Sequence, residues 1–382
     1  MESLLIQLRR DLHRLAELSF QEKETQTYLF SRLKELGLSP KVCAGTGLVL
    51  TLGEELPGKA IMFRADIDAL PIQEETNLAF ASKNKGVMHA CGHDGHTAMV
   101  FGAIVWAYQN LHRLARPLKF VFQPAEEQGG GAKVMVDEGV LSNPEVGEAY
   151  GLHLCNRLPS RKIGLAPGIF SAFIDEFSLK IYGRGGHAAR PYLCVEPIVI
   201  AARLILESQL ILTREINAMH ANVLTFSTIH SGERFNVIAD TCTMEGTMRS
   251  LSREDRQFIL KRLSQKIMAM EMEYECKIDF ELKSGYPAIY NDSECTGLVA
   301  EAVTDVLGEG HILPEIMGMG GEDMSYFLER VPGCYFLLGS GGTHLTYAAH
   351  HNPKFNFDES VLMAGTEIFC RLIEKRAMRK EG

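Results

Sequence analysis

The chain has 382 residues, of which 39 are Lys or Arg and 48 are Asp or Glu, so its formal net charge is −9. Hydrophobic residues make up 46% of the chain, which excludes disordered, collagen-like and low-complexity proteins. The length predicts about two domains, at roughly 100–200 residues each. An acidic chain without long basic runs is a poor candidate for binding nucleic acid. We also expect no membrane span, because no segment reaches the required ~18 apolar residues.

The nine cysteines are scattered along the chain and form no CxxC pair. Such spacing predicts reduced thiols and a cytoplasmic protein. The first 18 residues place leucines on one helical face with acidic residues between them, which predicts a surface helix and no signal peptide.

Apolar strands and amphipathic helices alternate over the first 170 residues. We expect strands that begin at Gly47, Ala60, Leu118 and Ala149, and helices over 22–37, 95–114 and 129–140. This alternation predicts an α/β fold whose sheet is at least partly parallel.

The pattern changes near Phe177, where strands begin to alternate apolar and polar residues as half-exposed strands do. From 177 to 285 the expected order is β-α-β-β-α-β, a split βαβ (ferredoxin-like) α+β unit. Helices near 293–307 and 359–378, with a strand at 334–340, then restore α/β character. We therefore expect an α/β domain of residues 1–175 and 287–382 with a mixed sheet, and an inserted domain of residues 176–286.

Polar residues follow three of the predicted strands: Asp66 and Asp68, then Glu126 and Glu127, then His153. In an open parallel sheet, the carboxyl ends of the strands meet at one edge, so these side chains should converge. Taken singly, a pair of carboxylates is usually solvated surface, and a histidine on an apolar strand is usually a hydrogen-bonded core residue.

The segment HACGHDGH at 89–96 and the segment HHNPKF at 350–355 add thiol and imidazole groups. Thiolate, imidazole and carboxylate together are ligands for Zn²⁺ and similar ions. A structural zinc needs four ligands, whereas five candidates stand here: Cys91, His93, Glu127, His153 and His351. The excess favours two metals about 3.5–4 Å apart. The alternative, a nucleophilic Cys91–His93 pair, needs an orienting group and an oxyanion hole that the sequence does not identify.

These motifs resemble the M20 metallopeptidase family, in particular its amidohydrolase branch of hippurate hydrolases, N-acyl-amino-acid deacetylases and N-acetyldiaminopimelate deacetylases. The matching segments run from RRDLH at 9–13 to about Glu359: RADIDALPIQEET, MHACGHDGHTAM, FQPAEE, GLH, GRGGHAARP, GEDMS and HHNPKF. CGHDGH together with QPAEE is highly specific, and GGHAA extends the resemblance into the inserted domain.

The resemblance implies a zinc-peptidase-like catalytic domain and roles for particular residues. The metal ligands would be Cys91, His93, Glu127, His153 and His351, with Cys91 bridging the two ions. Asp68 would orient a ligand, and Glu126 would be the general base that takes a proton from the water activated by the metals.

In the inserted domain, the resemblance implies a lid whose His187 stabilises the oxyanion, and whose Asn236 and Arg249 bind the substrate carboxylate. The chain departs from the family pattern at Tyr192, where a histidine is common, and at Ala239, where a proline is usual. Neither position is a ligand, so these departures bear on substrate preference or subunit pairing.

We therefore expect a metal-dependent amidohydrolase that cleaves N-acyl amino acids, with two divalent ions drawn from Zn, Mn, Co or Ni. A dipeptidase or carboxypeptidase using the same site is the alternative. A non-enzymatic binding module would require a lost ligand or base, and none is missing. The exposed edge of the lid sheet is a candidate surface for a homodimer.

Overall fold

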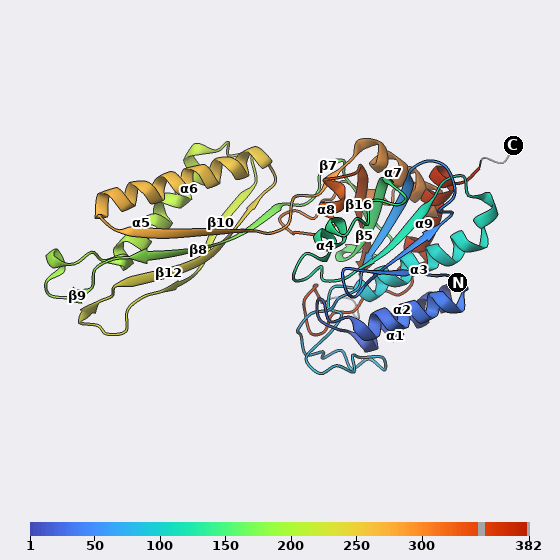
Figure 1. Ribbon diagram of the computed structural model, residues 1–382, viewed down its shortest axis with the longest axis horizontal. Coiled ribbons are helices and arrows are strands. Elements are labelled where there is room, and N and C mark those ends of the chain that lie inside the picture. The colour runs from blue at the N-terminus through green and yellow to red at the C-terminus, as the bar shows by residue number, and fades with distance from the viewer. Residues whose placement is uncertain (343–347, 380–382) are drawn as a thin grey trace. The chain divides into compact units, whose positions relative to one another are not determined.

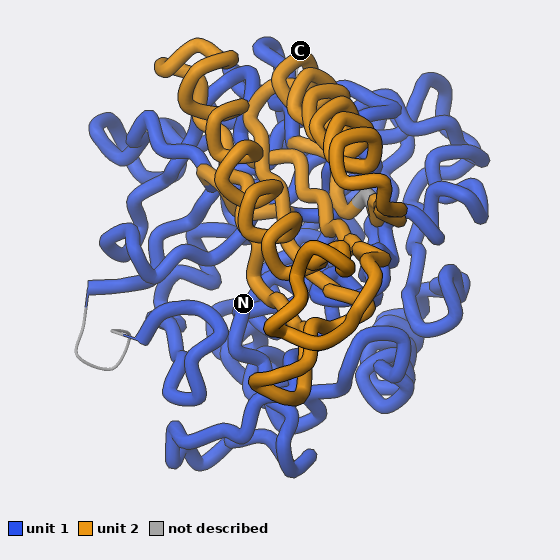
Figure 2. The backbone as a smooth tube through the Cα atoms, turned by 90° about the vertical axis from the view of Figure 1, so that its left-hand side faces the viewer, with its two compact units in different colours: residues 1–170, 289–317, 322–382 blue, residues 171–288, 318–321 orange. Residues whose placement is uncertain are grey.

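The computed structural model describes residues 1–342 and 348–379, which form two compact units (Figure 2). Unit 1 consists of Met1–Phe170, Ile289–Met317 and the described part of 322–382, and unit 2 consists of Ser171–Ala288 and Gly318–Gly321. The expected inserted domain, 176–286, falls within unit 2. Unit 2 begins earlier because its first strand starts at Phe173.

Unit 1 is built on an eight-stranded mixed sheet (Figure 1). Its strands, in spatial order, are β1 (Lys41–Cys43), β2 (Gly47–Leu52), β4 (Leu118–Gln123), β3 (Ala60–Asp66), β5 (Val146–Pro159), β16 (Gly333–Gly341), β6 (Ile163–Gly164) and β15 (Ile312–Leu313). Strands β4, β3, β5 and β16 are parallel to one another and form the middle of the sheet. A separate two-stranded sheet pairs β7 (Gly168–Ile169) with β14 (Tyr290–Asn291).

Both faces of this sheet are covered, which explains why β3 and β4 are buried at every residue. The helices of unit 1 are α1 (Glu2–Leu15), α2 (Lys23–Glu35), α3 (His93–Gln109), the 3₁₀ turn η1 (Leu111–Arg113), α4 (Gly131–Asp137), α7 (Ser293–Leu307), α8 (Ser325–Leu328) and α9 (Val361–Ala377). Helices α1, α2, α3, α7 and α9 pack on one face, in a cluster that includes Phe63 and Phe120. Helices α4 and α8 pack on the other face, against Met62 and Val121.

The register of the parallel strands places three polar positions level with one another. Asp66 at the end of β3 pairs with Gln123 at the end of β4. On the other side of β3, Arg64 pairs with Gly151 of β5. Asp66 and His153 each come two residues later on their strands, so these two residues are also level with one another. The carboxyl edge of the sheet therefore collects the side chains that the sequence places after these strands.

Unit 2 is an antiparallel sheet with the spatial order β10 (Asn222–His230), β12 (Thr241–Ser250), β8 (Phe173–Tyr182) and β13 (Lys277–Ser284). Two main helices, α5 (Pro197–Leu210) and α6 (Arg253–Tyr274), connect the strands in the order β-α-β-β-α-β. Smaller elements complete unit 2: β9 (Gly186–His187), β11 (Val237–Ile238), the 3₁₀ turn η2 (Pro191–Leu193) and the π-helical turn η3 (Ile211–Glu215).

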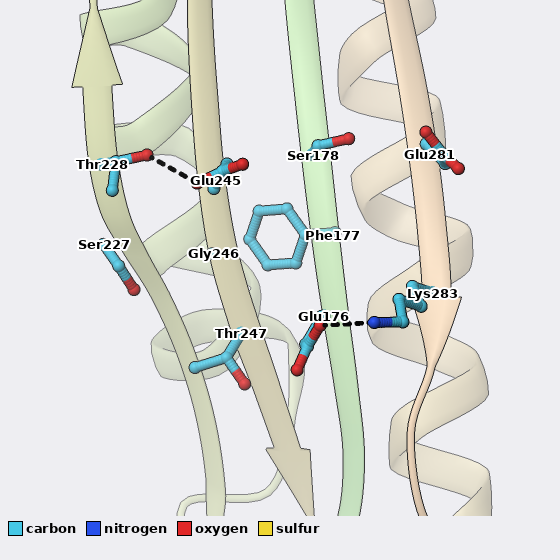
Figure 3. Close-up of a pocket in the computed structure, with 10 residues that line it drawn as sticks. All are labelled: Glu176, Phe177, Ser178, Ser227, Thr228, Glu245, Gly246, Thr247, Glu281 and Lys283. Atoms are coloured by element: carbon cyan, nitrogen blue, oxygen red, sulfur yellow. Dashed lines mark hydrogen bonds and ion pairs between the residues drawn. The ribbon is translucent and has the colours of Figure 1, made fainter. Parts of the chain in front are cut away.

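Glycine is required at position 246, in the middle of the unit 2 sheet. Gly246 pairs with Phe177 on β8, and the Phe177 ring lies beside the strand at this position (Figure 3). A Cβ atom at 246 would lie 2.3 Å from the Thr225 carbonyl oxygen and 2.4 Å from Phe177 Cζ. Both distances are shorter than any van der Waals contact, so the glycine lets the ring pack against the core.

We expect Gly246→Ala to lower the free energy of unfolding by about 1–3 kcal/mol, because the methyl group meets backbone as well as the ring. Thermal and denaturant unfolding measure this change. Gly297→Ala is the matched control, since a Cβ at 297 in helix α7 has no atom within 4 Å. If Gly246→Ala unfolded like the wild type, the packing described for Phe177 would be wrong.

The expected α/β fold class is confirmed, and most elements lie within a few residues of the predicted segments. Helix α3 begins two residues before the predicted start, because Gly92 takes a left-handed conformation and directs the chain into the helix at His93. The helix ends at Gln109, and the predicted remainder forms the turn η1. Among the described residues, no helix is long and apolar enough to cross a membrane.

Candidate metal centre

His93 is the first residue of α3 and is 1% exposed. Its Nδ1 lies 3.0 Å from the Asp68 carbonyl oxygen and 3.2 Å from Asp68 Oδ1. Both atoms are acceptors, so Nδ1 donates to Asp68 and Nε2 is the ring nitrogen left to face a cation. Nε2 is buried and has no hydrogen-bond partner among the described residues, as expected for an atom that binds a cation.

Cys91 and His153 complete the first group of donors. Cys91 lies in the turn before α3, and its Sγ is 3.4 Å from His153 Nε2. The other ring nitrogen of His153 donates to the Leu154 carbonyl oxygen at 2.6 Å. The donor atoms of Cys91, His93 and His153 all lie within 4.8 Å of one another.

Glu127 and His351 form a second group that shares Cys91 with the first. Glu127 Oε1 lies 3.5 Å from His351 Nε2 and 3.9 Å from His93 Nε2. This oxygen is also buried without a hydrogen-bond partner in the described part of the chain. Each of these two groups of three donors would offer ligands to one cation, and the Cys91 thiol is available to both.

The electrostatics of the centre also suit cations. Burial alone would lower the pKa of His93, but the charges of Asp66, Asp68 and Glu127 raise it to about 10. Burial, with the charges of Glu127 and Glu126, raises the pKa of the Cys91 thiol well above its ordinary value. An excess of buried negative charge therefore makes these groups retain protons, which divalent cations would displace. Sulfur, nitrogen and oxygen donors together fit zinc-like ions.

The raised pKa of Cys91 argues against the nucleophilic Cys91–His93 pair. A nucleophilic cysteine needs a lowered pKa, which a nearby positive charge or a helix N-terminus provides. Here the carboxylates around the thiol act in the opposite direction.

Three other polar side chains from the sequence candidates are engaged in hydrogen bonds beside the donor groups. His96 Nδ1 lies 2.7 Å from Asp66 Oδ1, and its Nε2 accepts from the Leu154 amide, so neither nitrogen is free. His350 Nε2 lies 2.9 Å from the Leu154 carbonyl oxygen. Asp66 also accepts from Arg64 at 2.8 Å. These hydrogen bonds connect the side chains and backbone that surround the donor groups.

Asp68 contacts the ring of His93 on the side away from Nε2. Its Oδ2 accepts from the Ser19 hydroxyl at 2.7 Å and from the Glu127 amide at 2.9 Å. One carboxylate thus fixes the ring of His93 and the backbone of Glu127. Burial raises the pKa of Asp68, but the hydrogen bond and charge of His93, together with the hydrogen bonds from Ser19 and the Glu127 amide, outweigh this effect and lower the pKa overall.

Glu126 is 7% exposed and faces a buried cluster that the sequence alone did not reveal. Its carboxylate lies within 4.8 Å of those of Glu322 and Asp323. Burial and the charges of Glu322, Glu127 and Asp323 raise the pKa of Glu126 well above its ordinary value. Arg64 donates to both Glu322 and Asp323, at 2.8 and 2.9 Å. The cluster joins residues far apart in the sequence, and the GEDMS motif was its only signal.

The other predicted site residues belong to unit 2. His187 on β9 pairs with Val237 on β11, and the Ala188 amide donates to the Asn236 carbonyl oxygen at 3.1 Å. His187 and Asn236 are therefore neighbours. Arg249 on β12 is half-buried, and its Nη1 has no hydrogen-bond partner among the described residues.

Comparisons with known proteins identify relatives of this chain. A family model described as peptidase family M20/M25/M40 matches residues 62–375. The chain belongs to this family. It is 37% identical to N-acetyl-L-cysteine deacetylase of Bacillus subtilis, over 95% of this chain and 86% of that protein. It is 37% identical to N-acetyldiaminopimelate deacetylase of Listeria innocua, over 97% of this chain and 99% of that protein.

One solved structure from this family has the same fold as this chain. YxeP of Bacillus subtilis, a dinuclear metal-binding peptidase of family M20, superposes with a TM-score of 0.84 at 33% identity. The superposition covers 97% of each chain.

Proposed function

We propose that the protein is a metal-dependent amidohydrolase that cleaves the amide bond of N-acyl amino acids, releasing a carboxylic acid and a free amino acid. The observation that carries the proposal is the pair of donor groups that share Cys91, beside the buried carboxylate of Glu126. The deacetylases at 37% identity support this class of substrate.

Five residues of unit 1 are proposed to hold two divalent cations: Cys91, His93, Glu127, His153 and His351. Once bound, such ions lower the pKa of a coordinated water and polarise an amide carbonyl. Zn, Mn, Co and Ni all remain candidates, because the centre mixes thiol, imidazole and carboxylate donors.

Glu126 is proposed to move the proton. Its carboxylate lies beside the donor groups, within 4.8 Å of the donor atoms of His93 and Glu127. It would take a proton from the attacking water and deliver it to the amine as the C–N bond breaks. Asp68 holds His93 and Glu127 in place through the contacts described above.

For unit 2, we propose that His187 stabilises the oxyanion and that Asn236 and Arg249 bind the substrate carboxylate. The unpartnered Nη1 of Arg249 supports its part in this proposal, because a half-buried guanidinium is suited to a carboxylate. Asn236 directly precedes β11, the strand that pairs with the His187 strand β9, and this proximity supports a shared role for the two residues.

We further propose a cytoplasmic homodimer that pairs through unit 2. All nine cysteines lie in the described residues and none forms a disulfide, which supports a reducing compartment. Helix α5 exposes Ile198, Val199, Leu206 and Leu210, and the exposed fractions of these side chains run from 47 to 70%. Apolar side chains grouped on one surface are typical of an interface between proteins.

A substrate panel tests the proposed activity. The purified enzyme, loaded with each candidate metal in turn, is assayed with acetyl- and benzoyl-amino acids and with matched dipeptides. We expect kcat/KM for the best N-acyl amino acid to exceed that for any dipeptide by at least about tenfold, roughly 1.4 kcal/mol in transition-state binding. Faster hydrolysis of dipeptides would instead assign a dipeptidase or carboxypeptidase, and no hydrolysis with any metal would contradict the proposal.

A further inference from the structure

Arg9, in the RRDLH segment of helix α1, has no role in the proposed chemistry, yet its side chain is fully buried. Its three donor groups reach three different side chains. Nε donates to Asp94 Oδ2 at 2.9 Å, Nη1 to Glu359 Oε1 at 3.1 Å, and Nη2 to Asn356 Oδ1 at 3.1 Å. The guanidinium also lies between two aromatic rings, 4.5 Å from the centre of Phe80 and 4.4 Å from that of Phe357. Such a site fixes the group in position and in orientation.

The partners of Arg9 belong to the two segments that carry ligands from opposite ends of the chain. Asp94 follows His93 directly, in the first turn of α3. Asn356 and Glu359 follow His351 in the segment that leads into α9. Arg9 is therefore a direct link between the segment of His93 and the segment of His351.

The segment of His351 depends on such links, because it contains no helix or strand between 348 and 360. The His351 amide donates to the Ala90 carbonyl oxygen at 2.8 Å, and the Asn356 carbonyl oxygen accepts from Asn156 at 2.8 Å. His351 itself has a φ of +63°, which is costly for a residue other than glycine. Its side chain is 54% exposed, so surrounding side chains do little to fix it.

His93 and His153 are held in a different way. Both are buried, and each has one ring nitrogen fixed by a hydrogen bond within the sheet edge, to Asp68 or to Leu154. The two donor groups therefore differ in what positions them. Only the group of Cys91, Glu127 and His351 includes a ligand on an irregular, half-exposed segment.

We propose that Arg9 is a positioning residue for the metal centre, which sets the place of His351 relative to α3 and so controls the affinity of the cation at Cys91, Glu127 and His351. The inference rests on the proposed metal centre. It assigns to α1, which supplies no ligand, a specific effect on one of the two ions.

Cobalt titration of the metal-free protein tests the inference, with the absorption bands of bound Co²⁺ as the readout of coordination. For the wild type we expect two equivalents of Co²⁺ to bind. For Arg9→Met we expect one equivalent to bind as in the wild type, with an unchanged spectrum, and the other to bind at least about tenfold more weakly. Arg9→Lys keeps the charge but has one nitrogen in place of the three that contact Asp94, Glu359 and Asn356, so its affinity for the weaker equivalent should lie between those of the wild type and Arg9→Met.

Two further variants separate positioning from a general loss of stability. Asn356→Ala removes a neutral partner of Arg9 and leaves its two carboxylate partners in place. This variant should lower the affinity for the same equivalent of Co²⁺, and it keeps the test available if Arg9→Met does not fold. Arg14→Gln is the control on the same helix. Arg14 bonds through its side chain to Asp11 and is a third exposed, so its loss should leave both equivalents unchanged.

The outcomes are distinct. Selective weakening of one equivalent in Arg9→Met or Asn356→Ala supports the inference. If both variants bound two equivalents with wild-type affinities and spectra, the inference would be overturned, even if their melting temperatures were lower. Arg9 would then have only a structural role. Equal weakening of both equivalents would overturn it as well. If the wild type itself failed to bind two equivalents of Co²⁺, that result would contradict the proposed metal centre and not the role of Arg9 alone.

Discussion

Glu126→Gln is expected to reduce turnover by about 10²–10⁴-fold while both metals stay bound. The amide has nearly the shape of the carboxylate but cannot accept a proton from water or pass one to the leaving amine. Glu126 is not one of the five proposed ligands, and its raised pKa shows that its surroundings are already crowded with negative charge, so the neutral amide should leave both metals bound.

The measurement is kcat on the best N-acyl amino acid, with metal content determined on the same sample. Glu127→Gln is the matched control, because it changes the adjacent residue in the same way. Glu127 contributes an unpartnered oxygen to the donor groups, so this control should lose metal along with activity. Near-normal turnover in Glu126→Gln would remove Glu126 as the base.

Cys91→Ser is expected to lower the affinity for both cations, by at least about tenfold each. Cys91 is the only residue common to the groups of His93–His153 and of Glu127–His351, among the described residues. A serine hydroxyl is a much weaker ligand than a thiolate for zinc-like ions, because it is far harder to deprotonate.

Elemental analysis after gel filtration measures this effect. Cys334→Ser is the control, since Cys334 is also fully buried but contacts the Thr296 hydroxyl in the core of unit 1. The control should retain its metal, although it should lose some stability. An unchanged metal content in Cys91→Ser would exclude Cys91 as the shared ligand.

Much of the fold followed from local patterns in the sequence. The mainly apolar strands β3 and β4 and the alternating strands β8 and β12 were predictable. Burial on two faces leaves a nearly continuous apolar run, and burial on one face leaves an alternating pattern. Two-residue strands such as β6 and β15 are too short to leave one. Their pairing is a consequence of how distant segments pack.

The site was predictable where chemistry is concentrated in short segments. The segment 89–96 offers three histidines, and the sequence could not show that Asp66 and the Leu154 amide occupy both nitrogens of His96. The cluster of Arg64 with Glu322 and Asp323 joins residues on distant segments, so no local spacing reveals it. The same holds for the contacts of Arg9 with Asn356 and Glu359.

The most direct test of the account is an anomalous difference map from crystals of the protein loaded with zinc. We predict two peaks about 3.5–4 Å apart, on either side of Cys91 Sγ. One peak should lie against His93 and His153, and the other against Glu127 and His351. A single peak, or two peaks without Cys91 between them, would contradict the account.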